Sequence, residues 1–273
     1  MLKQDPLNDI EYIFYLIESG IPFTFVRFSD GEMEIIHNNY LEISEKVTKY
    51  RNIQISNSYP SHDYKYFDPS RDFLFRDELL LSAKYISDFY FKGIATHHNV
   101  DAGDTLISDQ EILIGFNNRS LRNLTFSDLF LNSNFLIFRK KIKKVLKNIS
   151  TGYVVANFQS KLNGPLTNFE LLPVPNQAFQ VFSNLLEEHL KILMKAPSKS
   201  LILSSASSYS NILGYHLHRI RPDLFFLDIG TSLNDFLGLP LNTRVYHCLL
   251  DRSIKGRISA FIYKRSPGYQ LKW

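Results

Sequence analysis

The sequence is poor in cysteine: Cys248 is the only one among its 273 residues. A single cysteine excludes an intramolecular disulfide and a zinc site built from several thiolates, and it fits a reducing compartment. The sequence also lacks the run of about 20 apolar residues that a membrane-spanning helix needs. Its N-terminus lacks the uninterrupted apolar segment of a secretion signal. We therefore expect a cytoplasmic protein.

The chain has little net charge, because 31 Lys and Arg residues oppose 27 Asp and Glu residues and leave +4. The segment 251–273 holds six basic residues and one acidic residue, so the other 250 residues sum to −1. This distribution excludes a nucleic-acid binder with a uniformly basic surface. We expect a single domain over residues 1–245 and a basic C-terminal extension over 246–273 that packs on it through apolar residues such as Phe261.

Two basic segments, 135–149 and the C-terminal extension, have two interpretations. Either could contact the anionic inner face of a membrane. A solvated helix face and a surface strand are the simpler interpretation, and the one we favour from the sequence.

Apolar residues make up 44% of the chain and aromatic residues 14%, which is ample for a packed core. Strands and helices alternate along the last third of the sequence, which favours an α/β sheet with ligands at the carboxyl ends of its strands. We predict strands at 22–28, 52–56, 93–96, 153–156, 171–174, 201–203 and 224–227, and helices at 8–19, 32–38, 73–91, 135–149, 178–194 and 207–219. Residues 57–71 are predicted to be a polar loop.

The first predicted strand ends in the motif Arg27-Phe-Ser-Asp30-Gly-Glu32. Two carboxylates one residue apart at a strand-to-helix turn supply hard oxygen ligands for Mg²⁺ or Mn²⁺, with phosphates completing the coordination. Arg27 would then hold a phosphate oxygen. A structural alternative is that Asp30 caps the following helix and Glu32 is a first-turn acid favoured by the helix dipole.

The stretch from Phe25 to Ile36 resembles the opening motif of the GT-D-type glycosyltransferases, which usually reads Arg-Phe-Gly-Asp-Gly-Glu. Two later stretches occur in the order expected for that family. The segment 173–179 is similar to its Pro-x-x-Asn-Ala-Phe segment with one residue inserted or shifted, and 201–230, ending in Asp228-Ile-Gly230, is similar to its closing Asp-x-Gly unit. The resemblance runs from about residue 10 to about residue 240.

The resemblance implies a Rossmann-like α/β fold, with a largely parallel sheet flanked by helices, and metal-dependent sugar transfer from a nucleotide-diphosphate donor, UDP-linked. Asp30 and Glu32 would hold Mn²⁺ or Mg²⁺ against the donor pyrophosphate, and Arg27 would help to neutralise it. The acceptor would be a glycan or a surface polysaccharide.

The sequence departs from the family pattern at three places. Ser29 stands where the family has Gly. The turn from Ser204 to Ser208 replaces a Gly-Pro turn, and we expect Ser205, Ser207 and Ser208 to contact phosphate or ribose instead. Thr231 follows Gly230 where the family often has His, so no role can rest on that His.

Several further residues are candidates with ordinary structural alternatives. Asp228 would contact ribose or act as a base, or else cap the next turn. Asn176 would contact the donor or the acceptor, or else form an Asx turn. His62 or Asp63 would be the acceptor-side base. The cluster His97, His98 and Asp101 has metal-ligand residue types, but adjacent histidines on a strand point to opposite faces.

Two other functions use the same residues. One is a metal-dependent phosphohydrolase or phosphoryl-transfer enzyme, although the chain has no Gly-x-x-x-x-Gly-Lys-Ser/Thr loop. The other is a non-catalytic module that binds a nucleotide or a glycan.

Overall fold

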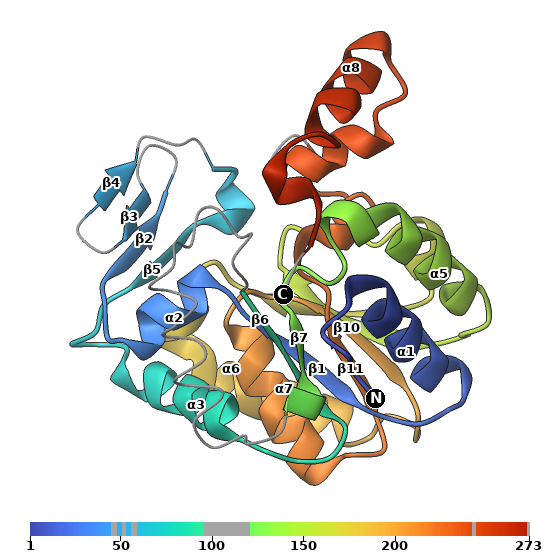
Figure 1. The fold of residues 1–273 in the computed structure, drawn as a ribbon. Helices are drawn as coiled ribbons and strands as arrows, with labels where there is room; N and C mark the ends of the chain where they lie inside the picture. The colour runs from blue at the N-terminus through green and yellow to red at the C-terminus, as the bar shows by residue number, and fades with distance from the viewer. Residues whose placement is uncertain (45–47, 51–52, 56–58, 96–120, 242–243, 272–273) are drawn as a thin grey trace.

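The computed structural model describes residues 1–44, 48–50, 53–55, 59–95, 121–241 and 244–271. Figure 1 shows an α/β body, a small antiparallel sheet to one side of it, and helix α8 (Ile254–Tyr263) projecting from the body. The functional cavity lies between these three parts, as described below.

The body is built on a sheet of seven strands in the order β7-β6-β1-β11-β10-β8-β9, and every neighbouring pair is parallel. In sequence order the strands are β1 (Thr24–Phe28), β6 (Tyr90–Ile94), β7 (Leu124–Phe126), β8 (Gly152–Asn157), β9 (Glu170–Val174), β10 (Leu201–Ser205) and β11 (Phe225–Asp228). Their carboxyl ends therefore meet at one edge. The first strand lies between β6 and β11 in the middle of the sheet, and α/β sheets bind their ligands beyond the carboxyl ends of their strands.

Helices cover both faces of this sheet, as the sequence predicts for an α/β protein (Figure 1). One apolar core lies under α2 (Asp30–Ile36), α3 (Phe73–Lys84), α6 (Ala178–Leu193) and α7 (Tyr209–Ile220), and the other under α1 (Pro6–Glu18) and α5 (Phe135–Lys147). The strand β1 contributes side chains to both cores, because Phe25 is buried in one and Val26 and Phe28 are buried in the other. Strands buried on both faces are continuously apolar and lack an alternating pattern.

A second sheet, in the order β4-β3-β2-β5, is antiparallel and is inserted between α2 and α3. Its strands are β2 (Leu41–Ile43), β3 (Thr48–Tyr50), β4 (Ile53–Ile55) and β5 (Lys65–Phe67). The predicted polar loop at 57–71 is therefore partly wrong, because it contains β5 and a 3₁₀ helix at Ser61–Asp63. Three-residue strands are too short to produce a readable periodicity.

The predicted helix at 73–91 is wrong in its last part. Helix α3 ends at Lys84, and β6 begins at Tyr90 after a turn in which Phe89 has φ +59°. All five residues of β6 are buried. A strand without alternation looks like the continuation of a buried helix in the sequence, and this caused the error.

The C-terminal extension is helical where the sequence favoured a surface strand. It contains a 3₁₀ helix, Val245–Leu250, followed by α8. Tyr246 and Tyr263 pack with Leu131 and Phe135 of the body, but Phe261 on the opposite side of α8 is 58% exposed. The extension therefore contacts the body through these two tyrosines, whereas Ile258, Phe261 and Ile262 are exposed. Within the described residues, no helix has both the length and the apolar character that crossing a bilayer requires.

One buried lysine gives the fold a pH dependence. Lys92 in β6 is 1% exposed, its Nζ donates to the carbonyl of Ala83 at 2.5 Å, and burial lowers its pKa to about 7. The unfolded chain, with the ordinary lysine pKa, binds more protons between about pH 7 and pH 10.5, so the contribution of Lys92 to stability rises over that range.

We therefore expect Lys92→Met to raise the free energy of unfolding by roughly 3 kcal/mol at pH 6, where the buried amine is charged in the wild type. The gain should shrink toward zero near pH 10, where the lysine of the unfolded chain also loses its charge. Urea unfolding of both proteins across this range measures the difference. A gain that does not change with pH would show that Lys92 keeps its ordinary pKa in the folded protein.

Candidate active site

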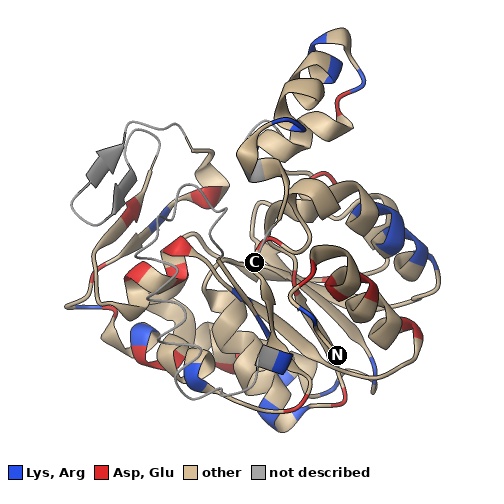
Figure 2. Ribbon diagram, viewed as in Figure 1, with Lys and Arg blue, Asp and Glu red and all other residues tan. Residues whose placement is uncertain are grey.

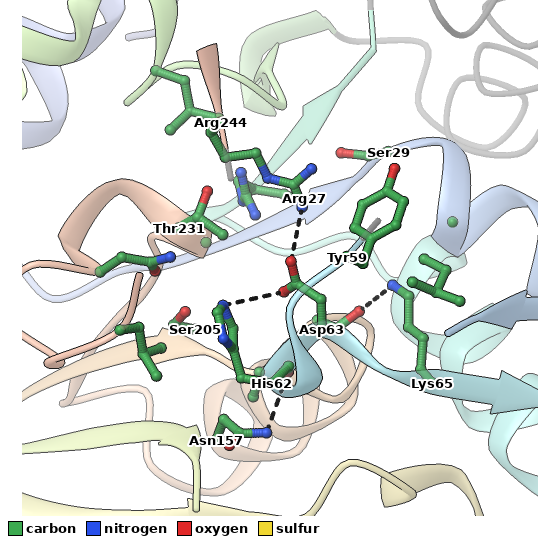
Figure 3. Close-up of a pocket in the computed structure, with 18 of the residues that line it drawn as sticks. Arg27, Ser29, Tyr59, His62, Asp63, Lys65, Asn157, Ser205, Thr231 and Arg244 are labelled. Atoms are coloured by element: carbon green, nitrogen blue, oxygen red, sulfur yellow. Dashed lines mark hydrogen bonds and ion pairs between the residues drawn. The ribbon is translucent and has the colours of Figure 1, made fainter. Parts of the chain in front are cut away.

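A cavity of about 950 Å³ lies at the carboxyl edge of the parallel sheet. Its floor comes from the ends of β1, β8, β9 and β10. One wall comes from residues 59–65, which lead into β5 of the small sheet, and the other from residues 244–266. Figure 3 shows side chains from these segments pointing into the same space. Ligand pockets for small molecules usually measure about 300–1,000 Å³, so this one has room for a nucleotide with a sugar.

Arg27, near the end of β1, lies at the bottom of the cavity. Its Nε is 3.3 Å from Oδ1 of Asp228 at the end of β11, and its Nη1 donates to the carbonyl of Ser127 at 3.3 Å. Gly230 makes room for the guanidinium. A Cβ on this residue, whose φ is +49°, would lie 2.1 Å from Nη2 of Arg27. The closing Asp-x-Gly unit therefore holds the arginine of the opening motif.

Asp30 and Glu32 of the motif have different environments. Asp30 is exposed and lines the cavity, and its Oδ1 accepts from the amide of Gly31 at 2.9 Å. Glu32 is 8% exposed, and its two oxygens accept from the amide of Ser29 at 3.0 Å and from the hydroxyl of Ser208 at 2.7 Å. Ser29, not Asp30, is the N-cap of α2, so the structural alternative was wrong for Asp30; Glu32 does lie in the first turn of α2, as that alternative expected.

The serines of the turn after β10 differ in whether they reach the cavity. Ser205 and Ser207 line the cavity, and Ser207 adopts φ +51°. Ser208 is fully buried and its hydroxyl donates to Glu32, so it cannot reach a ligand in the cavity. The prediction that Ser208 contacts phosphate or ribose is therefore wrong. Asp228 is 3% exposed and does not line the cavity. It pairs with Arg27, which does.

Asn176 lines the cavity, but its amide already has partners. Its Oδ1 accepts from Asn157 at 2.5 Å, and its Nδ2 donates to the carbonyl of Ser61 at 2.8 Å. Asn157 also donates to the carbonyl of His62 at 3.3 Å. These two asparagines connect the parallel sheet to the wall that carries His62 and Asp63.

Two basic residues missed in the sequence complete the cavity. Lys65, on β5, donates to the hydroxyl of Ser207 at 2.8 Å, and its Nζ would be 3.5 Å from a Cβ on Gly31. Arg244 lies over the ring of Tyr59, 5.8 Å from its centroid, and its Nη2 is 3.7 Å from Oδ2 of Asp63. The local sequence contains no signal for either residue, because each reaches the cavity from a segment outside the parallel sheet.

Carboxylates surround Arg27 more closely than the sequence indicates. Asp128, also missed, lines the cavity after β7. Burial raises its pKa, the charge of Arg27 opposes the shift, and the charge of Asp30 adds to it. Burial raises the pKa of Asp228 to about 6 against the effect of Arg27, and Glu32 adds to the rise. Burial would lower the pKa of Arg27, but Asp228, Asp128 and Glu32 outweigh it and raise that pKa.

The acceptor-side candidates His62 and Asp63 are neighbours on the cavity wall. His62 Nε2 is 3.8 Å from Oδ1 of Asp63, and the imidazole is 5% exposed. Burial lowers the pKa of His62, Asp63 opposes the shift, and Arg244 adds to it. His62 is therefore neutral at neutral pH and can accept a proton. The cluster His97, His98 and Asp101 lies outside the described residues.

Comparison with solved structures identifies the fold. The structure of "domain of unknown function 1792", described as having "a distinct glycosyltransferase fold", superposes with a TM-score of 0.50 at 13% identity, over 97% of this chain and 90% of that one. A second structure of this domain matches with a TM-score of 0.50 at 14% identity, over 84% and 81% of the two chains. The chain has this α/β glycosyltransferase-like fold.

A third solved structure, named "a new glycosyltransferase" from Streptococcus sanguinis, gives a TM-score of 0.49 at 18% identity, over 84% of each chain. No family model matches the sequence, and no curated protein matches it either. The likeness to the two structures with a TM-score of 0.50 agrees with the resemblance carried by the Arg27–Glu32 motif, and residue roles have to come from the site itself.

The carboxylates of Asp30 and Glu32 suit a divalent cation that is also coordinated by phosphates. Among the described residues, no group of three or more His, Cys, Asp or Glu side chains is arranged to hold a metal ion on its own. Mg²⁺ is usually bound through one or two carboxylates, with substrate phosphates and water as the other ligands. Asp30 is exposed and lines the cavity, so its carboxylate is placed where it could be one of these ligands.

Substitutions can separate two roles of Glu32, its structural hydrogen bonds to Ser29 and Ser208 and its expected role as a metal ligand. Glu32→Ala removes both hydrogen bonds, so we expect it to lower the free energy of unfolding by about 2 kcal/mol. Glu32→Gln should keep most of this stability, because its carbonyl can accept from Ser29 while the hydroxyl of Ser208 rotates to accept from its amide. Urea unfolding measures the stability, and a turnover assay the function. If Gln restores both stability and turnover, Glu32 is a structural cap and not a metal ligand.

Proposed function

We propose that this protein is a metal-dependent glycosyltransferase that moves a sugar from a nucleotide-diphosphate donor, UDP-linked, to a glycan or surface-polysaccharide acceptor. The observation that carries the proposal is the convergence of Arg27, Asp30 and Gly230 on one large cavity, at the carboxyl edge of the parallel sheet of a glycosyltransferase-like fold, with Asp228 holding Arg27 from behind. A fold alone does not define an activity, so the argument rests on these residues.

The charges of the cavity suit a nucleoside diphosphate. Asp30 and Glu32 would hold Mn²⁺ or Mg²⁺, which when bound supplies Lewis-acid stabilisation of the leaving diphosphate. Arg27 interacts with Glu32, lines the same cavity as Asp30, and would neutralise a phosphate oxygen. Lys65, which already reaches Ser207, is the second cation within reach of the diphosphate.

Polar side chains around this position can orient the donor. Ser205 and Ser207 offer hydroxyls at and after the end of β10, and Asn176 offers the remaining lone pair of its amide oxygen. Asp228 holds Arg27 from behind, so we assign it a positioning role in place of contact with the ribose. His62 is neutral, buried beside Asp63 and on the cavity wall, and is our candidate for the base that takes a proton from the acceptor hydroxyl.

The proposal is tested by incubating the full chain with a panel of nucleotide sugars and Mn²⁺, and measuring release of nucleoside diphosphate. Mass spectrometry of the products then distinguishes the alternatives. A sugar transferred intact to an acceptor or to water supports a glycosyltransferase. Release of inorganic phosphate or cleavage within the diphosphate supports a phosphohydrolase. Calorimetric donor binding that needs Mn²⁺ but gives no turnover with any acceptor supports a non-catalytic binding module.

A further inference from the structure

Helix α8 has an exposed apolar stripe that no described part of the chain covers. Ile254, Ile258, Phe261 and Ile262 are 79%, 57%, 58% and 64% exposed, respectively. Their spacing of four, seven and eight residues from the first puts them on one face of the helix. Val245, 68% exposed, adds to the apolar surface at the base of this segment.

Basic side chains flank the stripe. Lys255, Arg257, Lys264 and Arg265 are exposed, and the helix contains no acidic residue. The guanidinium of Arg265 lies 3.4 Å from the centroid of the Phe261 ring. At 100° per residue, Lys255 borders one side of the stripe, and Arg257 and Lys264 border the other. Figure 2 shows this basic helix projecting from the body.

The face of α8 opposite the apolar stripe packs on the body. Tyr263 is 8% exposed, packs with Leu131 and Phe135, and donates from its hydroxyl to Oδ1 of Asn132 at 2.6 Å. Gly256 is buried against Asp251, where a Cβ would come within 2.3 Å of the carboxyl carbon. The helix is thus held on the body with its apolar stripe facing outward.

We propose that α8 docks this protein on an anionic lipid bilayer. An apolar stripe bordered by Lys and Arg is the pattern of helices that lie in the membrane interface, where the stripe enters the acyl region and the cations meet the head groups. A second copy of the chain fits less well, because it would bring two basic helices together. The basic helix α5 fits less well too, since Lys141 and Lys144 already pair with Glu11 and Glu18.

Docking at α8 has a consequence for the acceptor. Ser259, Ile262 and Ser266 line the cavity, so the docked helix brings the mouth of the cavity to the bilayer surface. Resting on the proposed function, this geometry points to an acceptor glycan carried on a lipid, presented at the height of the cavity. A free acceptor in solution would gain nothing from this placement.

The test is co-sedimentation of the full chain with phosphatidylcholine vesicles prepared with and without phosphatidylglycerol. We expect binding to the anionic vesicles, weakened by salt, and little binding to the neutral ones. Ile258→Ser/Phe261→Ser and Lys255→Glu/Arg257→Glu should each weaken binding at least about tenfold. All four positions lie outside the cavity lining, so folding and donor hydrolysis without acceptor should stay at wild-type level.

Matched control variants make the same kinds of substitution on helices other than α8. Lys140→Glu/Lys147→Glu on α5 has the same charge change as the α8 variant, and Leu74→Ser/Leu81→Ser on α3 removes a comparable exposed apolar surface. Both should bind vesicles like the wild type. Absence of vesicle binding, equal losses in the controls, or an α8-dependent dimer in solution would overturn the proposal. Because vesicle binding needs no turnover, its failure would leave the glycosyltransferase assignment intact, and the reverse also holds.

Discussion

Asp30→Asn is expected to lower turnover of the nucleotide-sugar donor by at least about 100-fold, because the change removes the acidic cation ligand that we propose next to the leaving diphosphate. The variant should also need more Mn²⁺ for half-maximal rate. Stability should stay within about 0.5 kcal/mol of the wild type, because Asp30 is exposed and the Asn oxygen can still accept from the amide of Gly31. Nucleoside diphosphate release against Mn²⁺ concentration, with urea unfolding alongside, measures both effects.

A matched control for this change is Asp77→Asn on α3. Asp77 is 58% exposed and pairs with Arg76 outside the cavity, so the same loss of charge there should leave turnover and its Mn²⁺ dependence unchanged. Full turnover in Asp30→Asn would remove the metal role from this residue. A loss of turnover with unchanged Mn²⁺ dependence would instead indicate a contact between Asp30 and the substrate.

Gly230→Ala is expected to displace Arg27 and to lower kcat/KM for the donor by about 100-fold, the cost of a misplaced binding group. The added Cβ would lie 2.1 Å from Nη2 of Arg27, and the positive φ of residue 230 strains any residue with a Cβ by about 1–2 kcal/mol. The free energy of unfolding should therefore fall as well. Donor kinetics and urea unfolding separate the two effects.

Gly20→Ala isolates the backbone strain from the displacement of Arg27. Gly20 has φ +65°, and its added Cβ would meet only the flexible side chain of Lys199, at 3.2 Å. We expect a similar loss of stability from strain in this control, with donor kinetics unchanged. Wild-type kinetics in Gly230→Ala would contradict the role of the Asp-x-Gly unit as the support for Arg27.

The sequence by itself determined the α/β class, most helices and strands of the parallel sheet, and the segment from Arg27 to Glu32. These features are local: periodic apolar residues, turn residues between them, and carboxylates within one strand-to-helix turn are all readable within a short window. Other elements were missed or misread for physical reasons. The strand β6 is buried on both faces, so it continues the apolar pattern of α3, and the missed strands β2, β3, β5 and β7 are each three residues long. The C-terminal segment expected to be a surface strand is helix α8.

The tertiary structure decided which residues share the cavity. Lys65 meets Ser207 across 142 positions, and Ser208 meets Glu32 across 176, through contacts set by strand order and by the inserted sheet. It also decided that Asp228 supports Arg27 from behind, and that α8 turns its apolar face outward. Local patterns specify which face of an element is apolar. Whether that face becomes buried depends on what the rest of the chain packs against it, and for α8 that is decided by the body holding Tyr263 and leaving Phe261 exposed.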